Sequence, residues 1–241
     1  MVIRRGRAAW HVGTVRGARP ETPSARRIVL DVPTWPGNAA GQHLDVRLTA
    51  PDGYQATRSY SIATSGPDTL LELAVDELPD GEVSPFLVHE LAVGDELEVH
   101  GPLGAFFVWR PDETSSAPVL LIAGGSGVVP LVAMARAHAA AGDPTPFRLV
   151  YSVRTPDDVY FEKELADAAA SATAPLQVDY IYSRVTGRLT RDTLAAVAFP
   201  VSAAPQVFVC GPTAFVEAVA GWLVDIGHSP TSIRTERFGG T

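Results

Sequence analysis

Cysteine and lysine are nearly absent from this sequence of 241 residues, and each occurs once, as Cys210 and Lys163. A single cysteine cannot form a disulfide within the chain, and it cannot supply the thiolates of a Cys-ligated iron–sulfur cluster. The net charge of −8, with no offsetting stripe of Lys and Arg, argues against general nucleic-acid binding. We therefore expect no disulfide framework, no cluster of this kind and no nucleic-acid partner.

Long apolar runs are also missing. The mainly apolar run at residues 118–135 is short for a membrane span and is interrupted by glycines and Pro130. Residues 1–10 are basic but contain no apolar segment of the kind found in signal peptides. The histidines show no metal-ligand spacing. We expect a monomeric cytoplasmic protein with no membrane partner and no metal site.

The first half of the chain predicts a small β-barrel. Short β-branched or alternating runs, separated by Pro- and Gly-rich turns, occur at residues 12–16, 27–32, 43–48, 56–63, 70–75 and 96–100. Strands at this spacing favour an antiparallel barrel. A polar, proline-bounded stretch follows, which is typical of a linker. We expect a barrel domain over residues 1–111, a linker over 112–117 and a second domain over 118–241.

The second half has a different pattern of predicted elements. Apolar strands are predicted at residues 119–123, 147–153, 176–182, 206–210 and 232–236, with helices at 128–140, 159–170, 191–197 and 213–226 between them. This alternation indicates a parallel sheet covered by helices on both faces. In such sheets, ligands bind at the carboxyl ends of the strands.

Arg58-Ser59-Tyr60-Ser61 closes a strand-like run of the first half. Successive side chains of an extended backbone point to opposite faces, so Arg58 and Tyr60 share one face. A fixed cation beside a flat apolar ring suits a ligand with a phosphate at one end and a planar ring at the other. A flavin nucleotide fits this description, and we expect the tetrapeptide to contact one.

A glycine-rich loop joins the first strand of the second half to its helix, through Gly124, Gly125, Ser126, Gly127 and Pro130. Small residues let a diphosphate approach the backbone, and the helix N-terminus offers unpaired N–H groups. The loop is not a P-loop, because no Gly-Lys-Ser/Thr follows it, and proline takes the third glycine's place in the usual dinucleotide fingerprint. Proline is tolerated in the first helical turn, so a dinucleotide diphosphate remains the expected ligand.

Donors follow the next two strands of the second half. Arg154 comes after the second strand, and Ser183 and Arg184 come after the third. An arginine there accommodates a 2′-phosphate, whereas an acidic residue takes the ribose hydroxyls of NAD. Asp157 and Asp158 lie nearby and are also suited to capping the next helix. We favour NADPH over NADH.

Two further segments are of interest. In the first half, Gly81 and Ser84-Pro85 open a helix-like segment, where Ser84 is a good N-cap and Pro85 a good first helical residue. In the second half, Cys210 stands at the end of an apolar strand, before Gly211 and Pro212. A lone cysteine on such a strand is usually a small buried residue.

These segments, in this order and with the tail Thr235-Glu236-Arg237-Phe238-Gly239, resemble the ferredoxin–NADP⁺ reductase family. The likeness runs from Trp10 almost to the end of the chain. It implies a six-stranded antiparallel Greek-key barrel that carries FAD, in preference to FMN, followed by a five-stranded parallel α/β sheet that binds the nicotinamide cofactor.

The resemblance also implies roles for single residues of the flavin domain. Arg58 would bind the pyrophosphate, Tyr60 would stack on the isoalloxazine and Ser61 would hydrogen-bond near its N5. The backbone N–H groups of Val83 and Ser84, after Gly81, would bind phosphate.

In the second domain, the loop from Gly124 to Pro130 would hold the diphosphate of the nicotinamide cofactor. Arg154, Ser183 and Arg184 would surround its 2′-phosphate. Cys210 would lie by the nicotinamide ring, with Gly211 and Pro212 after it. Phe238, with Glu236 nearby, is similar to the terminal aromatic residue that covers the flavin in plant-type members, although Gly239-Gly240-Thr241 follows it here.

The implied activity is hydride transfer from NADPH to FAD, followed by single-electron transfer to a separate protein acceptor. We expect catalytic roles for Ser61, Cys210 and Glu236. A ferredoxin, a haem enzyme and a molybdenum enzyme all fit as acceptor. Two alternatives remain open: a flavin-binding electron-transfer subunit with little activity alone, and a flavin-free module that senses NADP(H).

Overall fold

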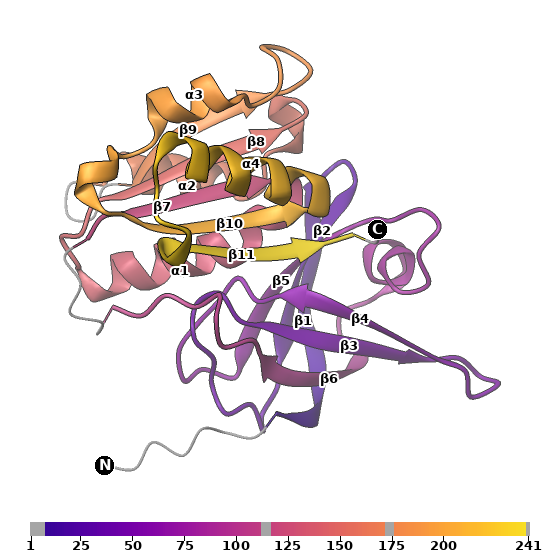
Figure 1. Cartoon of the computed structure of the whole chain (residues 1–241). Helices are drawn as coiled ribbons and strands as arrows, with labels where there is room; N and C mark the ends of the chain where they lie inside the picture. The colour runs from indigo at the N-terminus through magenta and orange to yellow at the C-terminus, as the bar shows by residue number, and fades with distance from the viewer. Residues whose placement is uncertain (1–7, 112–116, 172–175, 240–241) are drawn as a thin grey trace, which may run out of the picture. The chain divides into compact units, whose positions relative to one another are not determined.

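The computed structural model describes residues 8–111, 117–171 and 176–239. The chain divides into two compact units, Met1–Val108 and Trp109–Thr241, which are drawn in Figure 1. Most of the predicted linker, at residues 112–116, lies outside the described residues. Within the described residues, no helix has both the length and the apolar character needed to cross a membrane.

The first unit is an antiparallel sheet of six strands in the order β4-β3-β6-β1-β2-β5. Beyond β4, the N–H of Ala63 donates to the carbonyl of Glu72 in β5 over 2.8 Å, which joins the two edges of the sheet. The strands are β1 (Ala9–Thr22), β2 (Ala25–Asp31), β3 (His43–Thr49), β4 (Gln55–Ser61), β5 (Leu70–Asp76) and β6 (Glu96–Leu103).

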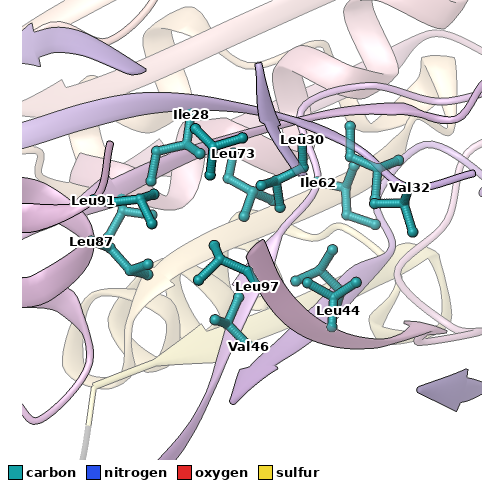
Figure 2. Close-up of a cluster of buried hydrophobic side chains, with 14 of the residues drawn as sticks. Ile28, Leu30, Val32, Leu44, Val46, Ile62, Leu73, Leu87, Leu91 and Leu97 are labelled. Carbon is teal, nitrogen blue, oxygen red and sulfur yellow. The ribbon is translucent and has the colours of Figure 1, made fainter. Parts of the chain in front are cut away.

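Alternate residues of these strands fill one apolar core. Ile28 and Leu30 of β2, Leu44 and Val46 of β3 and Leu73 of β5 are all fully buried. Figure 2 shows them with Leu87 and Leu91, which come from a short helical segment, η1 (Phe86–Glu90), and the residue after it.

The end of η1 is tied to the barrel by a side chain. Arg26 of β2 donates to the carbonyl of Leu91 over 2.8 Å and to that of Leu87 over 3.3 Å. Carbonyls at a helix end have no partner within the helix, so these bonds satisfy them. Arg26 therefore holds η1 over the core.

The predicted cap of this segment is wrong. Pro85, and not Ser84, occupies the N-cap position, and no side chain caps the helix. The Ser84 hydroxyl instead accepts a hydrogen bond from the N–H of Leu78 over 3.0 Å. Because β5 ends at Asp76, the Leu78 amide has no strand partner, and Ser84 supplies one.

The second unit is a parallel sheet of five strands in the order β11-β10-β7-β8-β9. The barrel followed by a parallel α/β sheet confirms the predicted fold class. The strands are β7 (Val119–Gly124), β8 (Phe147–Val153), β9 (Leu176–Tyr182), β10 (Gln206–Pro212) and β11 (Ile233–Phe238). The helices between them are α1 (Val128–Ala141), α2 (Glu162–Ala169), α3 (Arg191–Val197) and α4 (Thr213–Ile226).

Helices cover both faces of this sheet, and α1 and α4 lie on opposite faces in Figure 1. All six residues of β7 are buried, as expected for a central strand covered on both sides. From β7 the chain moves through β8 to β9, and it then returns to β10 on the other side of β7. The sheet therefore has its topological switch point between β7 and β10.

Helix α2 begins later than predicted, at Glu162. The preceding residues form a 3-10 turn, η3 (Pro156–Asp158), capped by Thr155 and Asp158. Phe161 follows with a φ of 56° and is buried. The left-handed conformation of this residue interrupts the helical pattern, so α2 begins only after it.

The glycine-rich loop runs against the backbone of β10 at the switch point. A Cβ atom on Gly127 would lie 2.3 Å from the carbonyl oxygen of Cys210 and 2.8 Å from the nitrogen of Gly211. Gly127 has an ordinary helical φ of −61°, so it is glycine because of this close approach and not because of its conformation. Gly125 has a φ of 54° and a conformational reason to be glycine.

We expect Gly127→Ala to lower the free energy of unfolding by about 2 kcal/mol or more, because the new methyl group meets backbone that cannot move aside. Gly221→Ala is the matched control. Gly221 lies inside α4, and a Cβ atom on it would have no neighbour within 4 Å, so alanine there should stabilise the protein by about 0.5–1 kcal/mol. Urea unfolding midpoints measure both changes, and equal midpoints for Gly127→Ala and the wild type would contradict the close approach.

Candidate functional site

One face of β4 in the first unit carries Arg58 and Tyr60, as predicted. Ser59, between them, points to the other face, where its hydroxyl donates to the Asp45 carboxylate over 2.6 Å. The side chain of Ser59 is thus not grouped with its two neighbours. Ser61 ends the strand opposite His43.

Arg58 already has an anionic partner. Its Nη2 lies 2.7 Å from Oε2 of Glu82, and about half of each side chain is exposed. The hydroxyl of Tyr54 donates to the other oxygen of Glu82, also over 2.7 Å. Hydrogen bonds from Tyr54 and Arg58 hold the pKa of Glu82 below its usual value, although partial desolvation opposes them.

Tyr60 combines an apolar ring with a neighbouring cation. Its ring packs against the barrel core. Burial raises the pKa of Tyr60 to about 12, while the charge of Arg58 acts in the opposite direction. The phenol therefore stays neutral at physiological pH, and the ring offers an uncharged flat surface beside Arg58.

Gly81, Val83 and Ser84 lie in the loop that leads into η1. The N–H of Gly81 donates to the carbonyl of Leu78 over 2.8 Å, and a Cβ at Gly81 would lie 2.9 Å from that oxygen. Glycine is therefore required for this turn. Val83 and Ser84 are buried, and their phosphate-binding roles stay predictions.

In the second unit, most of the predicted site residues gather at one edge of the sheet. The carboxyl ends of parallel strands share an edge. The strand ends and the loop after β7 bring together Gly124, Gly125, Ser126, Gly127, Arg154, Ser183, Arg184, Cys210, Gly211, Pro212, Glu236 and Phe238. Pro130 is buried in the first turn of α1.

The three donors predicted to bind a 2′-phosphate are neighbours. The N–H of Ser183 donates to the carbonyl of Val153 over 2.8 Å, and that of Arg184 to the carbonyl of Arg154 over 2.9 Å. These bonds continue the pairing of β8 and β9 beyond the strands, so the two arginines start from adjacent positions.

An aspartate pairs with one of these two arginines. Asp158 lies 2.6 Å from Nη2 of Arg154, and it also accepts hydrogen bonds from the N–H and the hydroxyl of Thr155, over 2.9 Å and 2.7 Å. Burial raises the pKa of Asp158, but Thr155 and Arg154 outweigh it and leave the pKa below its usual value. Asp158 is therefore ionised at neutral pH and held in place from two sides.

Cys210 is buried in β10, and only 1% of its surface is exposed. It pairs in register with Glu236 of β11. Burial raises the pKa of the Cys210 thiol well above its usual value, and the charge of Glu236 adds to this effect. Phe238 ends β11 opposite Pro212 and is partly exposed.

Sequence reasoning did not assign Tyr54 or Glu82 to the site, and it treated Asp158 as a capping residue. Asp158 does cap η3, but it also pairs with Arg154. Because side chains alternate between the two faces of a strand, residues 60, 58, 56 and 54 share one face, and this pattern could have placed Tyr54 beside Arg58. Glu82 stands between Gly81 and Val83, which the resemblance had already assigned to the flavin phosphates, but nothing in the sequence indicated its pairing with Arg58. Among the described residues, no group of His, Cys, Asp and Glu could hold a metal ion.

Comparisons with known families match both units. The oxidoreductase FAD-binding domain matches residues 22–108, and the oxidoreductase NAD-binding domain matches residues 121–221. The chain is 28% identical to the ferredoxin–NAD(P)⁺ reductase component of the naphthalene 1,2-dioxygenase/salicylate 5-hydroxylase systems of a Ralstonia species. That match covers 94% of this chain and 68% of the relative.

Another relative is the reductase subunit of an aromatic O-demethylase from an Amycolatopsis species, which is 33% identical, with 88% of this chain and 64% of the relative covered. Among solved structures, the Amycolatopsis cytochrome P450 reductase GcoB matches with a TM-score of 0.82 and 30% identity, over 98% of this chain and 73% of that one. Among eight of the curated relatives, the chain spans between 40% and 68% of the relative's length.

The FAD/NAD-binding domain of a nitric oxide dioxygenase from Vibrio cholerae shares the fold, with a TM-score of 0.82 over 97% of this chain and the whole of that domain, at 24% identity. Two domain matches in the predicted order, together with these relatives, agree with the motifs in the sequence. The chain belongs to the ferredoxin–NADP⁺ reductase family, with an FAD-binding domain followed by an NAD-binding domain.

Proposed function

We propose that this protein oxidises NADPH with bound FAD and passes the electrons singly to a separate protein acceptor. The observation that carries the proposal is the close approach of Gly127 to the Cys210–Gly211 backbone at the switch point of an NAD-binding domain. Open α/β sheets bind dinucleotides at that point. The names of the relatives, which include reductase components of oxygenases and a P450 reductase, support a protein acceptor.

The residues of the first unit fit a flavin. Arg58 offers a guanidinium to phosphate, and the neutral ring of Tyr60 offers a stacking surface on the same face. Ser61, one residue further on, would hold or donate a proton at N5 of the flavin. When bound, FAD supplies the redox chemistry itself, so the work of these residues is binding and orientation.

The residues of the second unit would position the nicotinamide cofactor. The loop from Gly124 to Gly127 would receive the diphosphate. Cys210 and Glu236 pair on adjacent strands at the carboxyl edge and would shape the nicotinamide side. Phe238 is proposed as the terminal aromatic residue that contacts the flavin.

The absorption spectrum of the purified full-length chain tests this function. Bands at roughly 375 and 450 nm are expected for oxidised flavin. NADPH should then reduce an artificial acceptor such as ferricyanide in the presence of the protein. A colourless protein that binds NADPH but no added flavin would support a sensor and overturn the proposal. A yellow protein without turnover would support an electron-transfer subunit.

Tyr60→Ala should weaken FAD binding about tenfold or more, because stacking of a ring on an aromatic side chain contributes about 1–3 kcal/mol. Tyr60→Phe is the matched control and should keep its flavin, since it preserves the ring. Flavin content after purification and fluorescence titration of the apoprotein measure both. Full flavin content in the alanine variant would show that Tyr60 does not stack on the ring.

We propose that the nicotinamide cofactor is NADPH and not NADH, because Arg154 and Arg184 start from adjacent positions. Arg184→Ala should lower kcat/KM for NADPH about tenfold, since a charged hydrogen bond contributes about 1.5–3 kcal/mol, and should leave NADH almost unaffected. Asp158→Asn should raise the preference for NADPH, because it frees Arg154 while an asparagine can still cap η3.

Arg191→Ala is the control for this series, since Arg191 is exposed on α3 and pairs with Asp192. Steady-state kinetics with both nucleotides measure all variants. A wild-type protein that prefers NADH, with no change in Arg184→Ala, would contradict the assignment of NADPH.

Cys210 should react slowly with iodoacetamide in the folded protein. Its raised pKa leaves very little thiolate at neutral pH, and burial blocks access. We expect alkylation at least about tenfold slower than in urea-denatured protein. Mass spectrometry follows the reaction, and rapid labelling of the native protein would show that the thiol is reactive and not merely a small buried group.

A further inference from the structure

Tyr151 of β8 is a large buried side chain with a polar end, and no role above has been assigned to it. It lies in the second unit and is fully buried. Its hydroxyl accepts a hydrogen bond from the backbone N–H of Tyr160 over 3.2 Å. A buried hydroxyl is stable only when it has a hydrogen-bond partner, and here the chain that follows β8 supplies one.

This hydrogen bond holds the connection between β8 and α2, which consists of residues 154–161. The connection begins with Arg154, which is proposed above to bind the 2′-phosphate, and then forms the turn η3, closed by its own hydrogen bonds. It ends at Phe161, whose left-handed φ of 56° precedes the start of α2. The N–H of Tyr160 therefore lies outside the helix, and the hydroxyl of Tyr151 serves as its acceptor. Tyr151 thus fixes where the connection returns to the sheet.

The ring of Tyr151 begins a row of three aromatic rings. Tyr151 is in register with Tyr180 of the adjacent strand β9 (Figure 1), and their ring centroids lie 6.1 Å apart. The rings of Tyr180 and Tyr182 are stacked, with centroids 5.9 Å apart and planes within 4° of parallel. The carbonyl of Tyr182 accepts the backbone hydrogen bonds that close the next turn, which carries Ser183 and Arg184. The row of rings therefore supports the turn after β9.

The start of α2 lies beside the same row. Burial raises the pKa of Tyr180 and of Tyr182, and the charge of Glu162, the first residue of α2, adds to this effect on both phenols. Helix α2 also packs against β9. The connection after β8 and the turn after β9 are therefore both held by the tyrosines, one through the hydroxyl of Tyr151 and the other through its ring.

We propose that Tyr151 is a positioning residue for the adenosine end of NADPH. Because it is fully buried, it acts by ordering these two segments before the nucleotide binds, and not by touching the nucleotide. This inference rests on the proposed function, since it takes Arg154, Ser183 and Arg184 as contacts of the nucleotide. A segment that is already ordered loses less conformational entropy on binding, so the effect falls on affinity and not on hydride transfer.

Tyr151→Phe removes the hydroxyl and keeps the ring, so it separates the two segments. In the flavin-loaded full-length protein, we expect peptides that cover residues 154–161 to exchange amide hydrogen at least about fivefold faster, because the N–H of Tyr160 loses its acceptor. Peptides that cover β9 and the turn after it should exchange as in the wild type. Hydrogen–deuterium exchange followed by mass spectrometry, without nucleotide, measures both. Unchanged exchange over residues 154–161 would overturn the inference.

The same variant should raise the KM for NADPH about fivefold and leave kcat almost unchanged, because the loosened connection must be ordered on binding. Adenosine 2′,5′-bisphosphate, which carries only the adenosine end, should inhibit about fivefold less well, and nicotinamide mononucleotide should inhibit as before. Val150→Ala is the matched control for lost stability. Val150 is fully buried in the same strand but packs on the opposite face, with side chains of α3 and α4, so its truncation should change none of these constants.

Substitutions of Tyr180 test the row of rings. Tyr180→Leu breaks the row and should raise the KM for NADPH about threefold, whereas Tyr180→Phe keeps the ring and should match the wild type.

Two kinds of failure can be told apart. An unchanged KM for NADPH in Tyr151→Phe would overturn the inference and leave Tyr151 a packing residue of the core, while the proposed function would stand. A wild-type protein that neither oxidises NADPH nor binds adenosine 2′,5′-bisphosphate would remove the proposed function and this inference with it.

Discussion

The approach of the Gly127 backbone to the Cys210–Gly211 peptide organises the second unit. It fixes the start of α1 against the end of β10, where the chain reverses its direction across the sheet. The ring of Phe215 in α4 packs closely on both Gly124 and Gly211, so that the loop is held from both faces. Side chains larger than hydrogen are therefore excluded at three positions of the switch point, and the unpaired N–H groups that begin α1 stay beside the carboxyl edge.

Electrostatics in the two units follow one pattern. In each unit, an arginine proposed to bind phosphate already pairs with a carboxylate. Arg58 pairs with Glu82 in the first unit, and Arg154 pairs with Asp158 in the second. A solvent-exposed ion pair contributes about 0–1 kcal/mol, and about half of the Arg58 and Glu82 side chains is exposed, whereas the Asp158 side chain is only 19% exposed. The two carboxylates differ in their other bonds. Asp158 accepts two hydrogen bonds from Thr155 besides its contact with Arg154, whereas Glu82 accepts one from the Tyr54 hydroxyl besides its contact with Arg58.

The sequence predicted most element bounds of the second unit closely, except for the start of α2, because β7 is a continuous apolar run and glycines follow α1 and α4. The first unit was less predictable. Strand β1 runs from Ala9 to Thr22, well beyond the expected 12–16, since pairing with β2 carries it through Pro20. Motifs placed Arg58, Tyr60 and the glycine loop correctly in the fold. The pocket lined by Tyr54, Phe86 and Leu97 could not be foreseen, because these residues come together only through the register of separate strands and the position of η1.

The chemistry of Cys210 limits what it can contribute. A thiol acts as a nucleophile or a redox group through its thiolate, and both burial and the adjacent Glu236 disfavour that form. The carbonyl of Cys210 and the amide of Gly211 lie against Gly127. The backbone at this position is therefore part of the close contact between β10 and the glycine-rich loop. A small, neutral, slightly polarisable side chain fits such a position. In the function proposed above, Cys210 would therefore contribute through its size and shape, and electron transfer would be left to the bound cofactor.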